Sequence, residues 1–155
     1  MITAQIESFQ ATLEELKPML PEHHRELGLF QDRMPLDPNF PAYFEAEDGG
    51  RLLFVTVREA GALIGYWISF ISPSLHYQST LANQMDIYWV HPDHRGKSAG
   101  FALADLVKAE SIRRGVKIWY VGSKNHKPSE WFFERLGFER CEAYFVQWIG
   151  DVDAA

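Results

Sequence analysis

The sequence predicts an α/β fold in which helices flank a central mixed β-sheet of about six to seven strands. An apolar run at residues 85–90, rich in β-branched and aromatic side chains, predicts a buried strand. An amphipathic helix pattern follows it and ends at Gly115, and a short apolar strand, Lys117–Val121, comes next, as a parallel β-α-β unit requires. Residues 51–58 and 63–71 predict two further strands joined by a short glycine-containing turn, which adds an antiparallel hairpin.

Strand and helix patterns also alternate along the N-terminal third of the chain. Apolar residues at every second position predict a first strand to about residue 8. A helical stripe follows from about residue 11, and we expect Pro18 and Pro21 to kink or end that helix. Residues 29–48 contain three prolines and four aromatic residues, which predicts a partly helical flap packed on the body.

The C-terminal half is expected to add one helix and one strand. A loop at residues 71–79 leads into the central strand, and a second loop, residues 123–127, follows the parallel strand. Pro128–Leu136 predicts a helix with proline in its first turn, and the apolar segment Ala143–Ile149 predicts the last strand. The whole chain, residues 1–155, is predicted to be one domain, since this length is enough for one full core.

Composition limits the classes of function. With 46% hydrophobic and 23% charged residues the chain is typical of soluble globular proteins, and a net charge of −6 argues against general nucleic-acid binding. No apolar run is long enough to span a membrane and no signal peptide is visible, so we expect no membrane partner and a cytoplasmic location. The single Cys141 fits a reducing cytosol, and its expected role is that of a small buried hydrophobic residue.

The adjacent pair His23 and His24 are of a residue type that binds metals. Neighbouring residues on a helix point in different directions, however, so the pair is unsuited to one metal ion. The spacing favours solvated histidines, and we predict no metal site.

The turn between the central strand and the next helix points most directly to chemistry. Pro92 ends the strand because proline has no N–H for a sheet ladder, and residues 95–100, the anion turn, open the helix with small and basic residues. Unpaired backbone N–H groups and the positive end of the helix dipole meet there, which is typical of a phosphate or pyrophosphate site. A nucleotide P-loop is excluded because its first glycine would fall on His91, and G-x-G-x-x-G fails because positions 96 and 100 hold the only glycines here. The alternative is an ordinary strand–turn–helix.

Two motifs resemble the GNAT N-acetyltransferase superfamily, and the resemblance spans nearly the whole chain. The anion turn is similar to that family's pyrophosphate loop, Q/R-x-x-G-x-G/A, which follows a strand ending in V-x-P. Arg95 and Gly100 fit this pattern and Val90-His91-Pro92 precedes it, whereas Ser98 replaces the middle glycine. The second motif, W-F-F-E-R-L-G-F at residues 131–138, resembles the family's F-Y-E-K/R-x-G-F.

The resemblance implies acetyl-CoA as cosubstrate. Its pyrophosphate would lie on the backbone amides of the anion turn, with added charge from Arg95 and Lys97. In this family the central antiparallel pair of strands splays apart, and backbone groups of the central strand hold the pantetheine, with Val90 nearest the thioester carbonyl. The loop after the parallel strand would contact the CoA arm, although a solvated loop is its alternative interpretation. The cofactor-binding residues that the resemblance predicts are Tyr88, Trp89, Val90, Arg95, Gly96, Lys97, Ser98, Ala99, Gly100 and Asn125.

The reaction implied is acetyl transfer to an amine, which must lose a proton while the departing thiolate is protonated or stabilised. Phe133 stands where the family's usual proton donor is a tyrosine, and phenylalanine cannot donate a proton. The predicted catalytic residues are Asp86 on the central strand and His76 and Tyr77 on the loop before it, each with a packing or solvent-facing role as the alternative. The His76-Tyr77 pair and Leu36-Asp37-Pro38 also resemble, more loosely, the acetyltransferases of tailed phages, which would imply a host cytoplasm.

Two functions remain open on the sequence. The first is an acetyl-CoA-dependent N-acetyltransferase that acts on a primary amine, either of a small molecule or of a protein lysine or N-terminus. The second is a catalytically weak or inactive acyl-CoA-binding or protein-interaction module, which Ser98 and Phe133 favour. The partners predicted are acetyl-CoA and an amine acceptor, with a homodimer left open.

Overall fold

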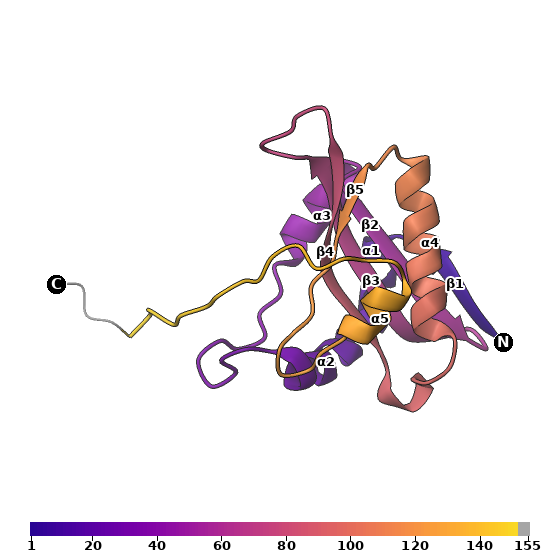
Figure 1. Ribbon diagram of the computed structural model, residues 1–155. Helices are drawn as coiled ribbons and strands as arrows, with labels where there is room; N and C mark the ends of the chain where they lie inside the picture. The colour runs from indigo at the N-terminus through magenta and orange to yellow at the C-terminus, as the bar shows by residue number, and fades with distance from the viewer. Residues whose placement is uncertain (152–155) are drawn as a thin grey trace.

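The computed structural model of the chain describes residues 1–151, so the last four residues of the predicted domain lie outside the described part. The described residues form a five-stranded mixed sheet with strand order β1-β2-β3-β4-β5 (Figure 1). The first four strands pair antiparallel, and β5 runs parallel to β4. The strands are β1 (Ile2–Ile6), β2 (Leu52–Glu59), β3 (Ala62–Pro73), β4 (Leu81–Val90) and β5 (Ile118–Tyr120). The mixed α/β class is confirmed, although the sheet is smaller than the six to seven strands expected.

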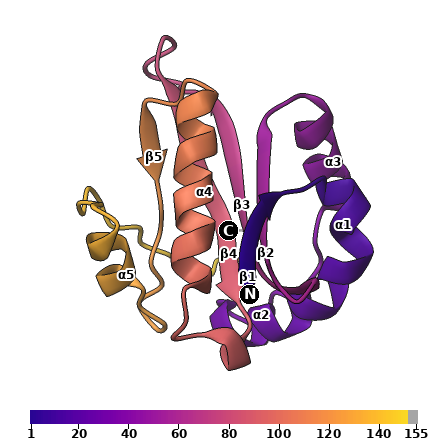
Figure 2. The same ribbon diagram turned by 90° about the vertical axis from the view of Figure 1, so that its right-hand side faces the viewer.

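Helices cover both faces of the sheet (Figure 2). On one face the chain forms α1 (Phe9–Leu16), the short 3-10 helix η1 (Lys17–Met19), α2 (Leu20–Leu27) and, within the flap, α3 (Phe40–Asp48). On the other face lie α4 (Ala99–Arg113) and α5 (Glu130–Arg135), and the short 3-10 helix η2 (Pro92–His94) follows β4. Pro18 and Pro21 lie in the first turns of η1 and α2, so they divide the N-terminal helix as expected.

The sheet separates two hydrophobic cores because side chains alternate between its faces. From β2, Leu53 and Val55 pack with Leu103 of α4, whereas Phe54 packs with Phe9 of α1 and with neighbours on the opposite face. The β-branched and aromatic runs that predicted these strands therefore supply both cores at once. Each core holds a helix layer against the sheet, and this fixes the two walls of the site described below.

The C-terminal segment differs from the sequence prediction. The structure assigns no strand to residues 143–149, and the segment runs outward from the body (Figure 1). The side chain of Phe145 is 96% exposed, and Cys141 is exposed as well, not buried as predicted. Near its end the segment touches the flap, where the rings of Trp148 and Phe30 lie 6.0 Å apart. An apolar segment forms a strand only where it can pair with a sheet edge, and this segment lies along none within the described residues.

Two irregularities in β4 prepare the site. Ile87 pairs with Ile68 and Met85 pairs with Ser69, so Asp86 is the extra residue of a β-bulge. The parallel pairing of β4 with β5 covers only residues 82–84. Beyond that point β5 leaves one edge of β4 unpaired, while the antiparallel pair β3–β4 stays together up to Val90. The splay therefore opens in the parallel pair, and not in the antiparallel pair as expected.

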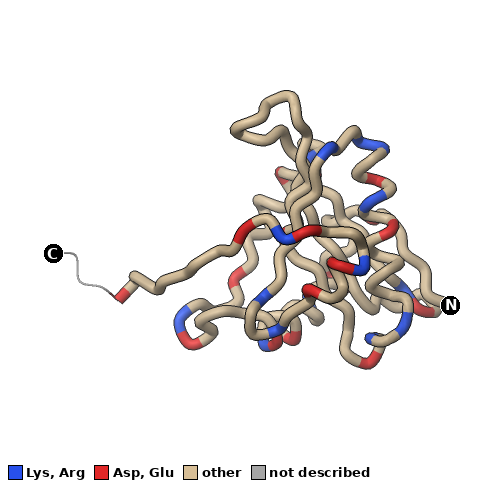
Figure 3. The backbone as a smooth tube through the Cα atoms, viewed as in Figure 1, with Lys and Arg blue, Asp and Glu red and all other residues tan. Residues whose placement is uncertain are grey.

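Charged residues of both signs are interspersed along the described chain (Figure 3). Within residues 1–151, no helix combines the length and the apolar composition that crossing a membrane requires. The same residues contain no group of three or more His, Cys, Asp or Glu side chains arranged to hold a metal ion.

Candidate active site

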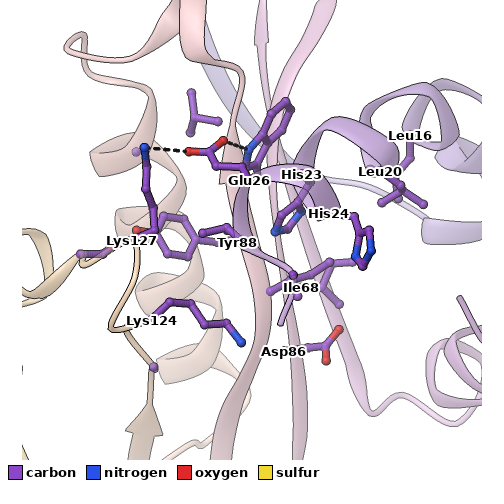
Figure 4. A pocket seen from close by; sticks show the side chains of 18 of the residues that line it. Leu16, Leu20, His23, His24, Glu26, Ile68, Asp86, Tyr88, Lys124 and Lys127 are labelled. Carbon is purple, nitrogen blue, oxygen red and sulfur yellow. Dashed lines mark hydrogen bonds and ion pairs between the residues drawn. The ribbon is translucent and has the colours of Figure 1, made fainter. Parts of the chain in front are cut away.

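A cavity of about 800 Å³ lies over β4, at the place where β5 leaves it. Residues 86–90 of β4 form its floor. In the close-up, Lys124 and Lys127 lie on one side of β4, and Leu16, Leu20 and the histidines of α2 lie on the other (Figure 4). The cavity therefore sits between the two helix layers and is bounded by segments from both halves of the chain.

Most of the predicted site residues line this cavity. They are Asp86, Tyr88, Trp89, Val90, Arg95, Gly96, Lys97 and Gly100. Ser98, Ala99 and Asn125 are not among the lining residues, and Ala99 is instead buried in the core beside α4. From the same loop as Asn125, Lys124 and Lys127 do line the cavity.

The structure does not bring the three predicted catalytic residues together. Asp86 lines the cavity, whereas His76 and Tyr77 lie on the exposed loop between β3 and β4 and are absent from the cavity wall. We expected His76 to approach Asp86, but the side chain that contacts Asp86 is Tyr43 of α3. Sequence reasoning could not find this partner, because 43 residues separate Tyr43 from Asp86.

The bulge and the flap together set the environment of Asp86. The hydroxyl of Tyr43 donates a hydrogen bond to the carboxylate, and the Tyr43 ring stacks on Phe9 with centroids 5.0 Å apart. Partial desolvation by the cavity walls raises the pKa of Asp86, and the hydrogen bond from Tyr43 acts in the opposite direction. Burial also raises the pKa of Tyr43, so its hydroxyl remains a donor at neutral pH. The arrangement offers a carboxylate with an elevated pKa that still faces the open cavity, which suits a proton acceptor.

The two histidines of α2 also line the cavity, and the interpretation of His23 as solvated is wrong. His23 is only 8% exposed, its Nδ1 lies 2.5 Å from the hydroxyl of Tyr66, and its ring stacks on Trp89. Burial lowers the pKa of His23 to about 4, so it is neutral at physiological pH. A sequence signal for its burial was present, because residues 16, 20, 23 and 27 follow helical spacing on one apolar stripe.

An ion cluster closes the end of the cavity next to the anion turn. Two nitrogens of Arg95 donate hydrogen bonds of 2.6 Å each to the carboxylate of Glu26, and a third donates to the carbonyl of Val90 at 2.8 Å. The indole N–H of Trp89 donates to the same carboxylate, and Lys127 approaches it from the opposite wall at 3.6 Å (Figure 4). The hydrogen bonds from Arg95 are the main cause that holds the pKa of Glu26 at about 2. The positive charge of Arg95 is thus paired inside the protein, and not free for a pyrophosphate as predicted.

The backbone of the anion turn does fit a diphosphate. Gly96 has a φ of 75°, a conformation that favours glycine, and Ala102 N–H bonds to Ser98 O at 2.9 Å as the first bond of α4. The amides before Ala102 therefore have no partner within the helix and can bind an anion. Ser98 has a φ of −82°, which any residue adopts, so serine in place of the family's glycine does not strain this turn.

The family's proton-donor position is not part of the cavity. Phe133 is only 5% exposed and packs against Trp67 and Phe138 in the core beside α5. The phenol that does line the cavity on this side of β4 is Tyr88, whose ring stacks on Phe132 with centroids 5.8 Å apart. Burial raises the pKa of Tyr88, against an opposing hydrogen bond with Ser129. Tyr88 therefore carries its proton at neutral pH.

The strands β4 and β5 separate beside the anion turn at the start of α4. This arrangement is suited to a phosphorylated cosubstrate that lies along the unpaired edge of β4. The sequence matches the acetyltransferase (GNAT) family over residues 9–138, and the chain belongs to this family. Acetyl-CoA is the acyl donor of that family, and the resemblance of the two motifs to the GNAT superfamily is confirmed, whereas the looser resemblance to phage acetyltransferases has no support here. A comparison with curated protein sequences gives no match.

Solved structures show the same fold. A ribosomal-protein-alanine N-acetyltransferase from Brucella melitensis biovar Abortus 2308 has a TM-score of 0.71 and 18% identity, covering 96% of this chain and 99% of its own. Glucosamine-6-phosphate N-acetyltransferase from Arabidopsis thaliana has a TM-score of 0.72 and 12% identity, covering 96% and 98%. A predicted acetyltransferase from Clostridium acetobutylicum, solved with acetyl-CoA, has a TM-score of 0.67 and 12% identity, covering 96% and 97%.

Proposed function

We propose that this chain is an acetyl-CoA-dependent N-acetyltransferase that acts on a primary amine. The observation that carries the proposal is that β4 joins two chemical features within one cavity. Asp86 stands near its middle, and its end leads into the anion turn. At about 3.3 Å per residue, the strand from Asp86 to Val90 spans about 13 Å. An acceptor amine beside Asp86 and a CoA arm anchored at the turn would meet above this stretch.

This chain has binding groups for two parts of acetyl-CoA, the pyrophosphate and the pantetheine arm. Acetyl-CoA, when bound, supplies the acetyl thioester that the amine attacks. The free amides of the anion turn would bind its pyrophosphate, and the unpaired edge of β4 would bind the amides of its pantetheine arm, as strand edges bind extended chains. Lys124 and Lys127 add positive charge to the same side of the cavity.

Two side chains would handle the protons. An alkylamine has a pKa near that of lysine, about 10, so at neutral pH it must lose a proton before it can attack. Asp86 would accept this proton, and the Tyr43 hydroxyl would keep its carboxylate oriented. The Tyr88 hydroxyl would donate a proton to the departing sulfur, taking the role that Phe133 cannot fill.

The test is amine-dependent release of CoA from acetyl-CoA. Because Cys141 is exposed, thiol reagents would also label the protein, so chromatography should follow CoA and the acetylated amine directly. We expect Asp86→Asn to lower kcat by about 10²- to 10³-fold while acetyl-CoA binding is retained. His76→Ala is the matched comparison, and we expect it to turn over like the wild type. Wild-type turnover by Asp86→Asn would remove Asp86 from the mechanism.

Phe133 favours a second candidate, an acyl-CoA-binding module without catalysis. The absence of the family's tyrosine from α5 is the specific observation behind it. Calorimetric binding of acetyl-CoA with no amine-dependent release of CoA, across amino acids, polyamines, aminoglycosides and lysine peptides, would support this candidate over the enzyme.

A further inference from the structure

We infer that the acceptor carries a single amine on an apolar body, an inference that rests on the proposed function. The acceptor end of the cavity, bounded by α1, α2, the flap and Asp86, has walls of aliphatic and aromatic side chains. Leu16, Leu20 and Ile68 back this end of the cavity (Figure 4) and are almost fully buried, whereas Leu27, Leu29 and Ile87 also line it and are in part exposed. A ligand with an apolar body would cover these walls and release water from them, which favours binding in proportion to the area covered.

The flap extends this apolar surface to the rim of the cavity. Met34 and Leu36 line the cavity and are each 41% exposed. Phe40 of the flap also lines the cavity and packs against Phe9 of α1, with ring centroids 6.4 Å apart. Contiguous apolar side chains left open beside a cavity mark a surface that a ligand covers.

The charges in the cavity limit the acceptor to one ammonium group. The Lys and Arg side chains in its lining are Arg95, Lys97, Lys124 and Lys127, and the carboxylates are Glu26, Asp37 and Asp86. Glu26 is paired with Arg95, and Asp37 lies beside Leu36 on the flap, at the rim of the cavity. Asp86 is therefore the carboxylate that faces the acceptor end from β4, with the Tyr43 oxygen beside it. Further ammonium groups of a polycation would lie against the apolar walls, where they lose hydration without a paired carboxylate, which disfavours polyamines and aminoglycosides.

A matched set of amines tests this inference. With saturating acetyl-CoA, we expect the kcat/KM of phenethylamine to exceed that of ethanolamine by about 30-fold or more, because the phenyl group buries apolar area that a hydroxyl group lacks. Spermidine and kanamycin should lie with ethanolamine or below it. A kcat/KM for either polycation at or above that of phenethylamine would overturn the inference.

Variants of the flap distinguish a loss of apolar contact with the acceptor from a general loss of folding. The double change Met34→Ser and Leu36→Ser should lower the kcat/KM of phenethylamine about five- to tenfold and leave ethanolamine unchanged. Leu75→Ser, an exposed leucine at the tip of the β3–β4 loop, should change neither value. An equal loss for both amines in the flap variant would count against an apolar acceptor.

Binding measurements keep the inference distinct from the proposed function. If no amine is acetylated, the proposed function fails, and calorimetry on the protein saturated with CoA still decides the ligand class. Binding of phenethylamine at least tenfold tighter than that of ethanolamine would retain an apolar monoamine site. Equal binding of the two amines, or no binding of either, would overturn it.

Discussion

Glu26 on α2 and Arg95 after β4 are joined by two hydrogen bonds of 2.6 Å each, although 69 residues separate them in the chain. The bidentate geometry is specific to a guanidinium and a carboxylate, and it holds α2 against the end of β4. Because α2 forms one wall of the cavity and Arg95 begins the anion turn, this pair holds that wall against the turn.

We predict that the pair makes stability depend on acid pH. The folded pKa of Glu26 is about 2 and lies below its unfolded value, so the pair stabilises the fold fully above about pH 5 and loses this effect as the pH falls toward 2. Since Glu26 is 17% and Arg95 36% exposed, solvent screening reduces the contribution to about 1–2 kcal/mol. Glu26→Gln should lose that amount in urea unfolding at pH 7 and almost nothing at pH 2. Glu14→Gln, in an exposed pair with Lys17, is the control and should show no change at either pH.

The anion turn gives a binding prediction with a matched pair of variants. A Cβ on Gly100 would lie 3.5 Å from the Phe132 ring, an ordinary contact, so Gly100→Ala should fold and bind acetyl-CoA. Gly100→Glu places a carboxylate beside the expected phosphates and should abolish binding in calorimetry, while its thermal unfolding stays close to that of Gly100→Ala. Unchanged affinity in Gly100→Glu would show that the pyrophosphate lies elsewhere.

Substitutions at Tyr88 and Phe133 should affect different properties, turnover in the first case and stability in the second. Tyr88→Phe removes the phenol in the cavity and should lower kcat about tenfold with little change in acetyl-CoA affinity. Phe133→Tyr restores the family's residue, but at a position that is only 5% exposed, so an unpaired hydroxyl should cost about 1–2 kcal/mol of stability without raising turnover. Steady-state kinetics and urea unfolding of both variants check this. Faster turnover in Phe133→Tyr would mean that α5 moves to present this residue.

The hydrogen bond between Tyr43 and Asp86 should appear in the pH–rate profile. It favours the charged carboxylate, so Tyr43→Phe removes that support and should raise the pKa of Asp86 further. If Asp86 is the base, the ascending limb of kcat/KM therefore moves to higher pH in Tyr43→Phe and disappears in Asp86→Asn. Tyr77→Phe loses the same hydroxyl outside the cavity and should keep the wild-type profile. An unmoved limb in Tyr43→Phe would assign it to another group.

The stretch from the central strand through α4 could be predicted from sequence because its signals are local. These signals are a proline that stops the strand, a turn of small residues, and a helical stripe that ends at Gly115. Each depends only on residues that are close together in the sequence. The structure agrees, with Gly115 at a φ of 87° just after α4. The family motifs lie in this same kind of stretch, so the eight cavity residues found from sequence come from β4 and its turn.

What the tertiary structure decided is the partner of each functional group. Plain alternation would put Asp86 on the face of β4 that carries Tyr88, but the bulge turns it toward Tyr43 of the flap. Glu26 meets Arg95, and His23 meets Tyr66, only because α2 folds back across the sheet. Residues 143–149 carry a strand pattern and form no strand, since pairing depends on a free edge and not on the segment itself. Periodicity is a property of neighbouring residues along the chain, whereas a bulge, a charge partner and a sheet edge are set by residues brought together from distant positions.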